Sequence, residues 1–149
     1  MKYKIPVSVL VVVHTPELKV LLLERADRPG FWQSVTGSQH EGESLVETAV
    51  RELREETGLE AENYGLTDWH KQSRFEIYAS WRSRYAPGVT HNLEHVFGLE
   101  VPHVLPVTLE PREHLRYEWL AWEAAVQKVF SWTNADAIRE LPRRTAEKP

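Results

Sequence analysis

Three glutamates that share one helical edge are the residues of this chain best suited to chemistry. Glu52, Glu55 and Glu56 lie close together in a segment with helical periodicity, and at roughly 100° per residue they span an arc of about 100°. Like charges four residues apart destabilise an isolated helix by roughly 0.2–0.5 kcal/mol. A divalent cation reverses that sign, because magnesium prefers oxygen ligands and is usually bound by carboxylates together with phosphate oxygens. The spacing therefore predicts a magnesium site on an open acidic edge.

The helix that carries these acids has recognisable ends in the sequence. Ser44 and Glu47 match a capping box, in which each side chain accepts a hydrogen bond from the other residue's backbone amide. Gly58 is placed to end the helix in a left-handed conformation. We therefore expect a helix over Ser44–Thr57. The apolar stripe that we expect to bury against a sheet consists of Leu45, Val46, Ala49, Val50 and Leu53.

Arg51 is expected to organise the acidic edge. Glu47 precedes it by four residues and Glu55 follows it by four, so the guanidinium can hold one carboxylate while leaving others for metal. A solvated acidic face is the usual explanation of such a helix. Gly37 and Glu43 stand in register before it, however, and favour a functional site. We expect Glu43 to pair with Arg51 or to support the loop.

The segment from Gly37 to Leu59 reads G-x5-E-x7-R-E-U-x-E-E-x-G-U, where U is apolar, and every specified position matches. This pattern resembles the signature of the Nudix hydrolases, which cut diphosphate linkages with magnesium. The resemblance implies an α/β fold, an α/β/α sandwich in which a mixed β-sheet lies between helical layers. It also implies Mg²⁺ as the cofactor, with Mn²⁺ as a substitute, and a small-molecule triphosphate as the substrate.

Within this resemblance, Glu52 and Glu56 are the leading metal ligands. Glu55 and the carbonyl of Gly37 are further ligand candidates. Glu52 is alternatively the general base, since members of the family differ in which carboxylate takes the proton of the attacking water. The residues expected to be catalytic are Arg51, Glu52, Glu55 and Glu56.

Three further segments resemble one branch of the superfamily, the bacterial dihydroneopterin triphosphate pyrophosphatases. They are Phe31–Gly37, Arg84–Thr90 and Ser131–Asn134. The branch resemblance implies hydrolysis of 7,8-dihydroneopterin triphosphate to the monophosphate and pyrophosphate, a step in folate biosynthesis. Two alternatives stay open. One is a broader pyrophosphatase of dATP-like or oxidised nucleotides, and the other is a ligand-sensing module without turnover, which the intact carboxylate set disfavours.

The branch also implies residues outside the acidic helix. Glu113 matches an additional metal-binding acid, with Glu110 as the competing choice, and Lys4 and Arg25 match positions that contact substrate. For the pterin ring, the matching positions are Thr36, Phe75, Glu76, Ile77, Tyr78 and Ser131. Arg82 and Arg84 either contact phosphates or belong to a solvated basic loop. Phe31, Trp32 and Trp132 are expected to be core residues, and the histidines show no spacing typical of metal ligands.

Composition indicates one soluble domain over residues 1–149. The chain has 42% hydrophobic and 27% charged residues, a net charge of −4 and no cysteine, which excludes disulfides and thiolate metal sites. The acidic balance argues against a nucleic-acid partner. The apolar run Val7–Val13 is too short for a membrane span and predicts a buried strand rather than a signal peptide. We expect a cytoplasmic monomer or small homo-oligomer with no membrane partner, and a frayed tail over 142–149.

Hydrophobic runs and turn residues predict the remaining elements. Phe31–Val35 should lead into the loop at Gly37. The predicted strands are Val7–Val13, Val20–Leu23, Phe75–Trp81, Leu93–Val101 and Tyr117–Leu120. Two final helices are expected over Glu123–Phe130 and Asn134–Leu141, with Asn134 as an N-cap.

Overall fold

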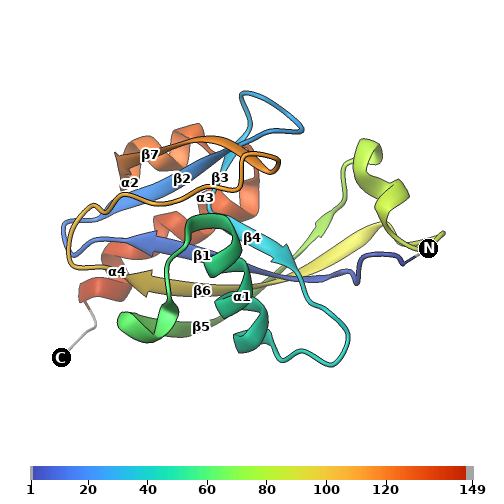
Figure 1. Ribbon diagram of the computed structural model, residues 1–149, viewed down its shortest axis with the longest axis horizontal. Coiled ribbons are helices and arrows are strands. Elements are labelled where there is room, and N and C mark those ends of the chain that lie inside the picture. The colour runs from blue at the N-terminus through green and yellow to red at the C-terminus, as the bar shows by residue number, and fades with distance from the viewer. Residues whose placement is uncertain (1, 147–149) are drawn as a thin grey trace.

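A seven-stranded mixed β-sheet organises the computed structural model, which describes residues 2–146 (Figure 1). The main path runs β3-β2-β1-β6-β5, with β4 paired to β1 and β7 paired to β2. The β1–β6 pair is parallel and the other pairs are antiparallel. The strands are β1 (Val7–His14), β2 (Lys19–Arg25), β3 (Trp32–Gln33), β4 (Val35–Ser38), β5 (Gly65–Glu76), β6 (His91–Glu100) and β7 (His114–Ala121).

Helices cover both faces of the sheet, as the expected sandwich requires. Helix α1 lies on one face, and α2, α3 and α4 lie on the other (Figure 1). Strand β1 shows why both faces are apolar: Val9 and Val11 pack on the α1 side, whereas Leu10 and Val12 pack on the opposite side. The helices are α1 (Leu45–Thr57), α2 (Trp122–Lys128), α3 (Trp132–Arg139) and α4 (Leu141–Ala146), with 3-10 turns η1 (Ala61–Asn63) and η2 (Ala79–Arg84).

The ends of α1 are those that the sequence predicts. The hydroxyl of Ser44 accepts from the amide of Glu47 at 3.1 Å, and the Glu47 carboxylate accepts from the Ser44 amide at 2.8 Å. Gly58 ends the helix with φ +76°. Within the apolar stripe, Leu53 is fully buried, but Val46 is 51% exposed. The prediction of a buried Val46 was therefore wrong, because this side chain lies at the rim of the stripe in the first helical turn.

Strand β5 is the main element that sequence patterns miss. Its residues are mostly exposed and polar, because β5 is an edge strand that, among the described strands, pairs only with β6. The predicted strand Phe75–Trp81 is wrong beyond Glu76. After the amide of Ile77 donates to the carbonyl of Thr90 at 2.8 Å, the chain leaves the sheet and turns through η2.

The C-terminal helices also differ from the prediction. Asn134 lies inside α3, whose N-cap is Ser131. The buried Asn134 amide instead accepts from the Ser34 amide at 2.8 Å and donates to the Ser34 hydroxyl at 3.0 Å, so it pins α3 to the sheet. Residues 142–146, expected to be frayed, belong to α4, and 147–149 lie outside the described residues. No helix within the described part of the chain is long and apolar enough to cross a membrane.

The capping box gives a direct test of how α1 is fixed. Replacing Ser44 with alanine removes the acceptor for the Glu47 amide, and should lower the free energy of unfolding by about 1 kcal/mol. Replacing it with aspartate keeps an acceptor and should leave stability nearly unchanged. Urea denaturation followed by circular dichroism measures both variants. Equal stabilities for the two would show that the cap does not contribute.

Candidate active site

The acidic edge of α1 faces an open cleft of about 950 Å³. Glu52, Glu55 and Glu56 line it together with Gly37 of β4 and Glu113, which precedes β7. The sequence-predicted metal residues are thus brought together from three separate segments. The competing acid Glu110 does not line the cleft and pairs with Arg112 at 2.7 Å.

Arg51 fixes the orientation of the neighbouring carboxylates through hydrogen bonds. Its guanidinium contacts Glu43 at 2.7 Å, Glu52 at 2.6 Å and Glu55 at 3.3 Å, and donates to the Ser38 carbonyl at 3.0 Å. The predicted pairing with Glu43 is present, whereas Glu47 is committed to the helix cap. Hydrogen bonds from Arg51 hold the pKa of Glu43 well below its usual range. Glu43 is therefore ionised, and its charge offsets that of Arg51.

Glu56 is the buried member of the acidic set, with only 1% of its surface exposed. Burial raises the pKa of Glu56 well above its usual range, and the hydrogen bond with Glu52 and the charge of Glu52 add to the shift. The Oε1 atom of Glu56 has no hydrogen-bond partner among the described residues. Two carboxylates this close need a shared proton or a cation between them.

His114, which the sequence left unassigned, lies beside this pair. Its Nε2 is 3.8 Å from Oε1 of Glu56, and the residue is 4% exposed. Burial, together with the charge of Arg25, lowers the pKa of His114 to about 4. The imidazole is therefore neutral at pH 7 and supplies no positive charge to Glu56.

Gly37 has no room for a side chain. A Cβ at this position would overlap the carboxylate of Glu52, so the backbone of β4 and the acid pack directly against each other. The glycine is required by this close approach rather than by a left-handed backbone. Its neighbour Thr36 donates its backbone N–H to Glu56 and its hydroxyl to the Val9 carbonyl at 2.8 Å.

Positive charge collects at one end of the acidic cleft. Lys4, Arg25 and Arg84 line both this cleft and an adjoining pocket, so they stand at the passage between the two. Asp27 accepts from Arg25 at 2.7 Å and from Arg84 at 3.0 Å, and the guanidinium of Arg25 lies 4.4 Å from the centroid of the Trp81 ring. Both arginines are therefore oriented before a ligand arrives.

The charges at this passage repel one another. Lys4 remains accessible on the cleft side, but the surrounding protein lowers its pKa, and the charges of Arg84 and Arg25 lower it further. An anion placed between the three cations would relieve that repulsion. Arg82, by contrast, donates to the Ile77 carbonyl at 3.0 Å and contacts Glu76, and it lines neither cavity.

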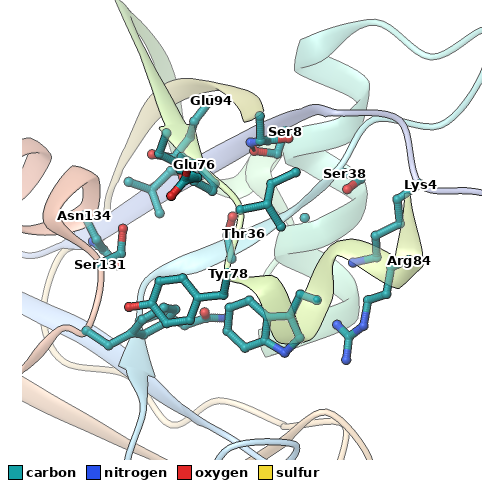
Figure 2. Close-up of a pocket in the computed structure, with 18 of the residues that line it drawn as sticks. Lys4, Ser8, Thr36, Ser38, Glu76, Tyr78, Arg84, Glu94, Ser131 and Asn134 are labelled. Carbon is teal, nitrogen blue, oxygen red and sulfur yellow. Dashed lines mark hydrogen bonds between the residues drawn. The ribbon is translucent and has the colours of Figure 1, made fainter. Parts of the chain in front are cut away.

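The adjoining pocket has a volume of about 280 Å³ and aromatic side chains along part of its wall, which makes it the aromatic pocket of the site (Figure 2). Tyr78 stacks on Trp81 with ring centroids 5.2 Å apart, and Phe130 and Phe31 pack edge-on or tilted against them. All the predicted ring-contacting residues line this pocket, namely Thr36, Phe75, Glu76, Ile77, Tyr78 and Ser131.

Of the two tryptophans expected in the core, Trp32 lies there and Trp132 does not. Trp32 is 5% exposed and packs in the core, as predicted. The prediction for Trp132 was wrong: it is 62% exposed at the edge of the pocket, because α3 begins there and turns its first residue outward. Phe31 is half-buried and packs against Phe130, one of the aromatic residues that line the pocket, without lining the pocket itself.

The pocket also contains polar residues that sequence reasoning missed. Asn92 and Glu94 of β6 line it and are 2% and 4% exposed, respectively. Burial raises the pKa of Glu94 to about 7, opposed by a hydrogen bond with Thr133. The available signal was their two-residue spacing in β6, which places both side chains on one face of the sheet.

Comparisons with known proteins agree with this arrangement. A model of the NUDIX domain family matches residues 4–141. This chain belongs to the Nudix hydrolase family. It is 46% identical to the dihydroneopterin triphosphate diphosphatase of Escherichia coli K12 over 93% of each chain. It is 43% identical to the Haemophilus influenzae protein of the same name, over 94% of this chain and 89% of that protein.

Solved structures show the same relationship. The E. coli dihydroneopterin triphosphate pyrophosphohydrolase superposes with a TM-score of 0.89 at 45% identity, covering 94% of this chain and 97% of that chain. A Caenorhabditis elegans Ap4A hydrolase superposes with a TM-score of 0.74 at 19% identity, over 95% and 98% of the chains, and shares the fold alone.

Nudix hydrolases generally use divalent metal ions, and the donors in this cleft fit one. Glu56 offers an unpartnered buried oxygen, and the Glu52 carboxylate to which it hydrogen-bonds packs directly against the backbone of Gly37. Among residues 2–146, no three acidic or histidine side chains are arranged so that they could hold a metal ion by themselves. An open set of oxygens completed by water and phosphate is what magnesium prefers.

Substituting Gly37 tests the close approach of β4 to the acids. Gly37→Ala should displace the Glu52 carboxylate and lower kcat by at least about tenfold, because a small shift of a catalytic group is costly. Gly65, where a Cβ meets no atom within 4 Å, provides the control Gly65→Ala. Steady-state kinetics with Mg²⁺ measure both variants, and an unchanged kcat in Gly37→Ala would contradict this role.

The buried acid of the pocket should weaken the empty protein in a pH-dependent way. Glu94 has an ordinary pKa of 4.5 and a pKa of about 7 when folded. Below pH 4.5 it is protonated in both states, and above pH 7 folding must bury its charge. Glu94→Gln should therefore raise the free energy of unfolding by about 3 kcal/mol at pH 8 and by little at pH 4.

Urea denaturation at the two pH values measures this difference. Glu100→Gln, at the opposite end of β6, is the matched control for removing one negative charge from the same strand. An equal effect of Glu94→Gln at pH 4 and pH 8 would show that Glu94 is not held protonated by burial.

Proposed function

We propose that this protein hydrolyses 7,8-dihydroneopterin triphosphate to the monophosphate and pyrophosphate, with Mg²⁺ as its metal and Mn²⁺ as a substitute. The main support is the 46% identity to the E. coli dihydroneopterin triphosphate diphosphatase, which extends over 93% of both chains. The aligned region covers nearly the whole chain, and it therefore contains most of the residues that line the acidic cleft and the aromatic pocket.

The layout of the site is consistent with a ligand that joins a flat ring to a chain of phosphates. The aromatic pocket accommodates the ring, Lys4, Arg25 and Arg84 receive the phosphates, and the acids lie beyond them. Stacked aromatic walls bind planar heterocycles well. Arginine forks match phosphate oxygens, so a triphosphate spanning both cavities would satisfy each group in turn.

In the proposed reaction, water attacks a phosphorus of the triphosphate and pyrophosphate leaves. The bound metal would supply charge neutralisation for the phosphates and a more acidic water. Glu56, Glu52 and the Gly37 carbonyl would hold it, with Glu55 and Glu113 as additional oxygen donors. Arg51 keeps Glu52 and Glu55 oriented, and Lys4, Arg25 and Arg84 stabilise the charge that develops on the leaving group.

A carboxylate in the cleft must accept the proton from the attacking water. Glu113 suits this role as well as that of a ligand, because it faces the other acids. Burial raises its pKa, and the charges of Glu52 and Glu55 raise it further. Glu52 is the other candidate base. Glu113→Gln and Glu52→Gln distinguish them, since loss of the base removes the acidic limb of the pH–rate profile.

We further propose that this is a cytoplasmic enzyme that acts on a freely diffusing small molecule as a monomer or small homo-oligomer. The net charge of −4 disfavours a nucleic-acid partner. Size-exclusion chromatography with light scattering measures the oligomeric state.

A panel of triphosphates tests the proposed substrate. The purified protein is incubated with Mg²⁺ and either dihydroneopterin triphosphate, dATP or 8-oxo-dGTP, and pyrophosphate release is measured. The pterin triphosphate should give the highest kcat/KM. A large preference for dATP or 8-oxo-dGTP would contradict the proposal and favour a nucleotide pyrophosphatase. Reaction in oxygen-18 water locates the attacked phosphorus.

Removing the buried acid should separate chemistry from folding. Glu56→Gln should lower kcat by roughly 100-fold or more, because it removes a charged ligand of the phosphate-bound metal. Its circular dichroism spectrum should be unchanged. Glu62→Gln, an exposed acid of η1, is the control and should retain full activity. Full activity of Glu56→Gln would remove this residue from the metal site.

A further inference from the structure

Two buried acceptor atoms at one end of the aromatic pocket have no partner. They are Oδ1 of Asn92 and Oε1 of Glu94, both within the described part of the chain. The residues are 2% and 4% exposed, yet both line the pocket. A buried polar atom without a hydrogen bond typically destabilises a protein by roughly 1–3 kcal/mol. Two such atoms in the same pocket indicate a ligand that satisfies them.

Both unpartnered atoms at this end of the pocket are hydrogen-bond acceptors, so a ligand must bring donors to them. The Asn92 side-chain amide donates to the Ser8 hydroxyl at 2.7 Å, which fixes the orientation of the amide and leaves its oxygen without a partner. Thr133 hydrogen-bonds to Glu94, and Ser131 contacts the Thr133 hydroxyl at 2.8 Å. The polar end therefore has a defined geometry with unused oxygen lone pairs.

This polar end lies away from the phosphate passage. Figure 2 shows Lys4 and Arg84 on one side of the pocket, and Glu94, Ser131 and Asn134 on the other. Glu94 and Asn92 line only the aromatic pocket, whereas Lys4 and Arg84 also line the acidic cleft. A ligand with its phosphates at the passage would thus present its far ring edge to Glu94.

We propose that Glu94, with Asn92 beside it, selects the substrate ring by accepting hydrogen bonds from two adjacent N–H donors. The matching ring edge is a 2-amino-4-oxopyrimidine, in which an exocyclic amino group stands next to a ring N–H. This inference rests on the proposed function, because it takes the ring-bearing triphosphate as given and assigns what reads the ring.

The chemistry of the edges gives the selectivity. Pterins and guanine both carry the amino group and the ring N–H side by side, so a carboxylate can accept from both at once. Adenine instead presents a ring nitrogen acceptor beside its amino group, which places two acceptors against each other. A site built to accept hydrogen bonds discriminates strongly against such a ligand, since its buried acceptors are then left unpaired.

Exchanging the carboxylate for an amide tests this assignment. Glu94→Gln keeps the size of the side chain but turns one acceptor into a donor. With Mg²⁺ present, kcat/KM for dihydroneopterin triphosphate and GTP should fall roughly 10- to 100-fold, mainly through KM, because each charged hydrogen bond contributes substantially. For ATP it should stay constant or rise. The ratio of pterin to adenine activity is therefore the decisive quantity.

Binding of the ring alone gives a second measurement that does not depend on turnover. Dihydroneopterin without phosphates is titrated against the protein and followed by tryptophan fluorescence. Glu94→Gln should weaken this binding by a similar factor. Glu94→Asp, which retains a shorter carboxylate, should keep the preference for pterin over adenine, and Glu100→Gln should match the wild type in every assay.

The outcomes separate the two proposals. If Glu94→Gln lowers activity on all triphosphates by the same factor, or leaves the pterin-to-adenine ratio unchanged, the role of Glu94 in ring selection is wrong. The proposed function would then stand on wild-type turnover. If the wild type binds the ring through Glu94 but does not hydrolyse its triphosphate, the proposed function is wrong and ring selection by Glu94 stands.

Discussion

The repulsion between Glu52 and Glu56 is the constraint on which the rest of the site depends. The two carboxylates lie together at the buried edge of α1, and β4 comes so close at Gly37 that no side chain fits between. Arg51 neutralises the outer acids, but His114, whose Nε2 lies 3.8 Å from Glu56, is uncharged at neutral pH. The raised pKa of Glu56 favours a proton on this carboxyl in the empty protein, and a divalent cation would replace that proton at the point where phosphates arrive.

Crowded or unpaired charges also occur along the rest of the binding cavity, and their sign alternates from one group to the next. Beyond the acids, Lys4, Arg25 and Arg84 crowd together with Asp27 as their common counter-ion. Beyond the cations, Glu94 is buried with an unused oxygen. Each group destabilises the empty protein, and each is complementary to one part of a ring-bearing triphosphate. The apolar layers on both faces of β1 provide the stability that offsets these groups.

Local sequence predicts the parts of the structure in which a residue's role depends on its neighbours in the chain. The capping box at Ser44, the left-handed Gly58 and the spacing of the α1 acids are of this kind, and the fold follows from the family pattern. Local sequence does not predict strand β5, because an exposed edge strand needs no alternation of apolar residues and is held by backbone pairing with β6. Asn134 likewise has the composition of a helix cap but bonds to Ser34, far away in sequence.

Residues of the site divide in the same way. The acids of α1 can be recognised in the sequence because several glutamates lie close together at helical spacing. Asp27, His114 and Glu94, in contrast, are single polar residues in segments that show no motif. Their environment comes from long-range packing: Asp27 meets Arg84 from η2, His114 reaches Glu56 of α1, and Glu94 contacts Thr133 of α3. Only the folded structure shows that these side chains are buried or paired, and therefore that they bear on function.

Crystallography with Mn²⁺ and a non-hydrolysable triphosphate would test the central claim most directly. The anomalous signal of manganese identifies the metal independently of any assay. Our account predicts a peak within about 2.2 Å of a Glu56 oxygen, next to Glu52 and the Gly37 carbonyl, with the phosphates directed toward Lys4, Arg25 and Arg84. A metal bound elsewhere in the cleft without Glu52 or Glu56, or no metal at saturating Mn²⁺, would contradict it.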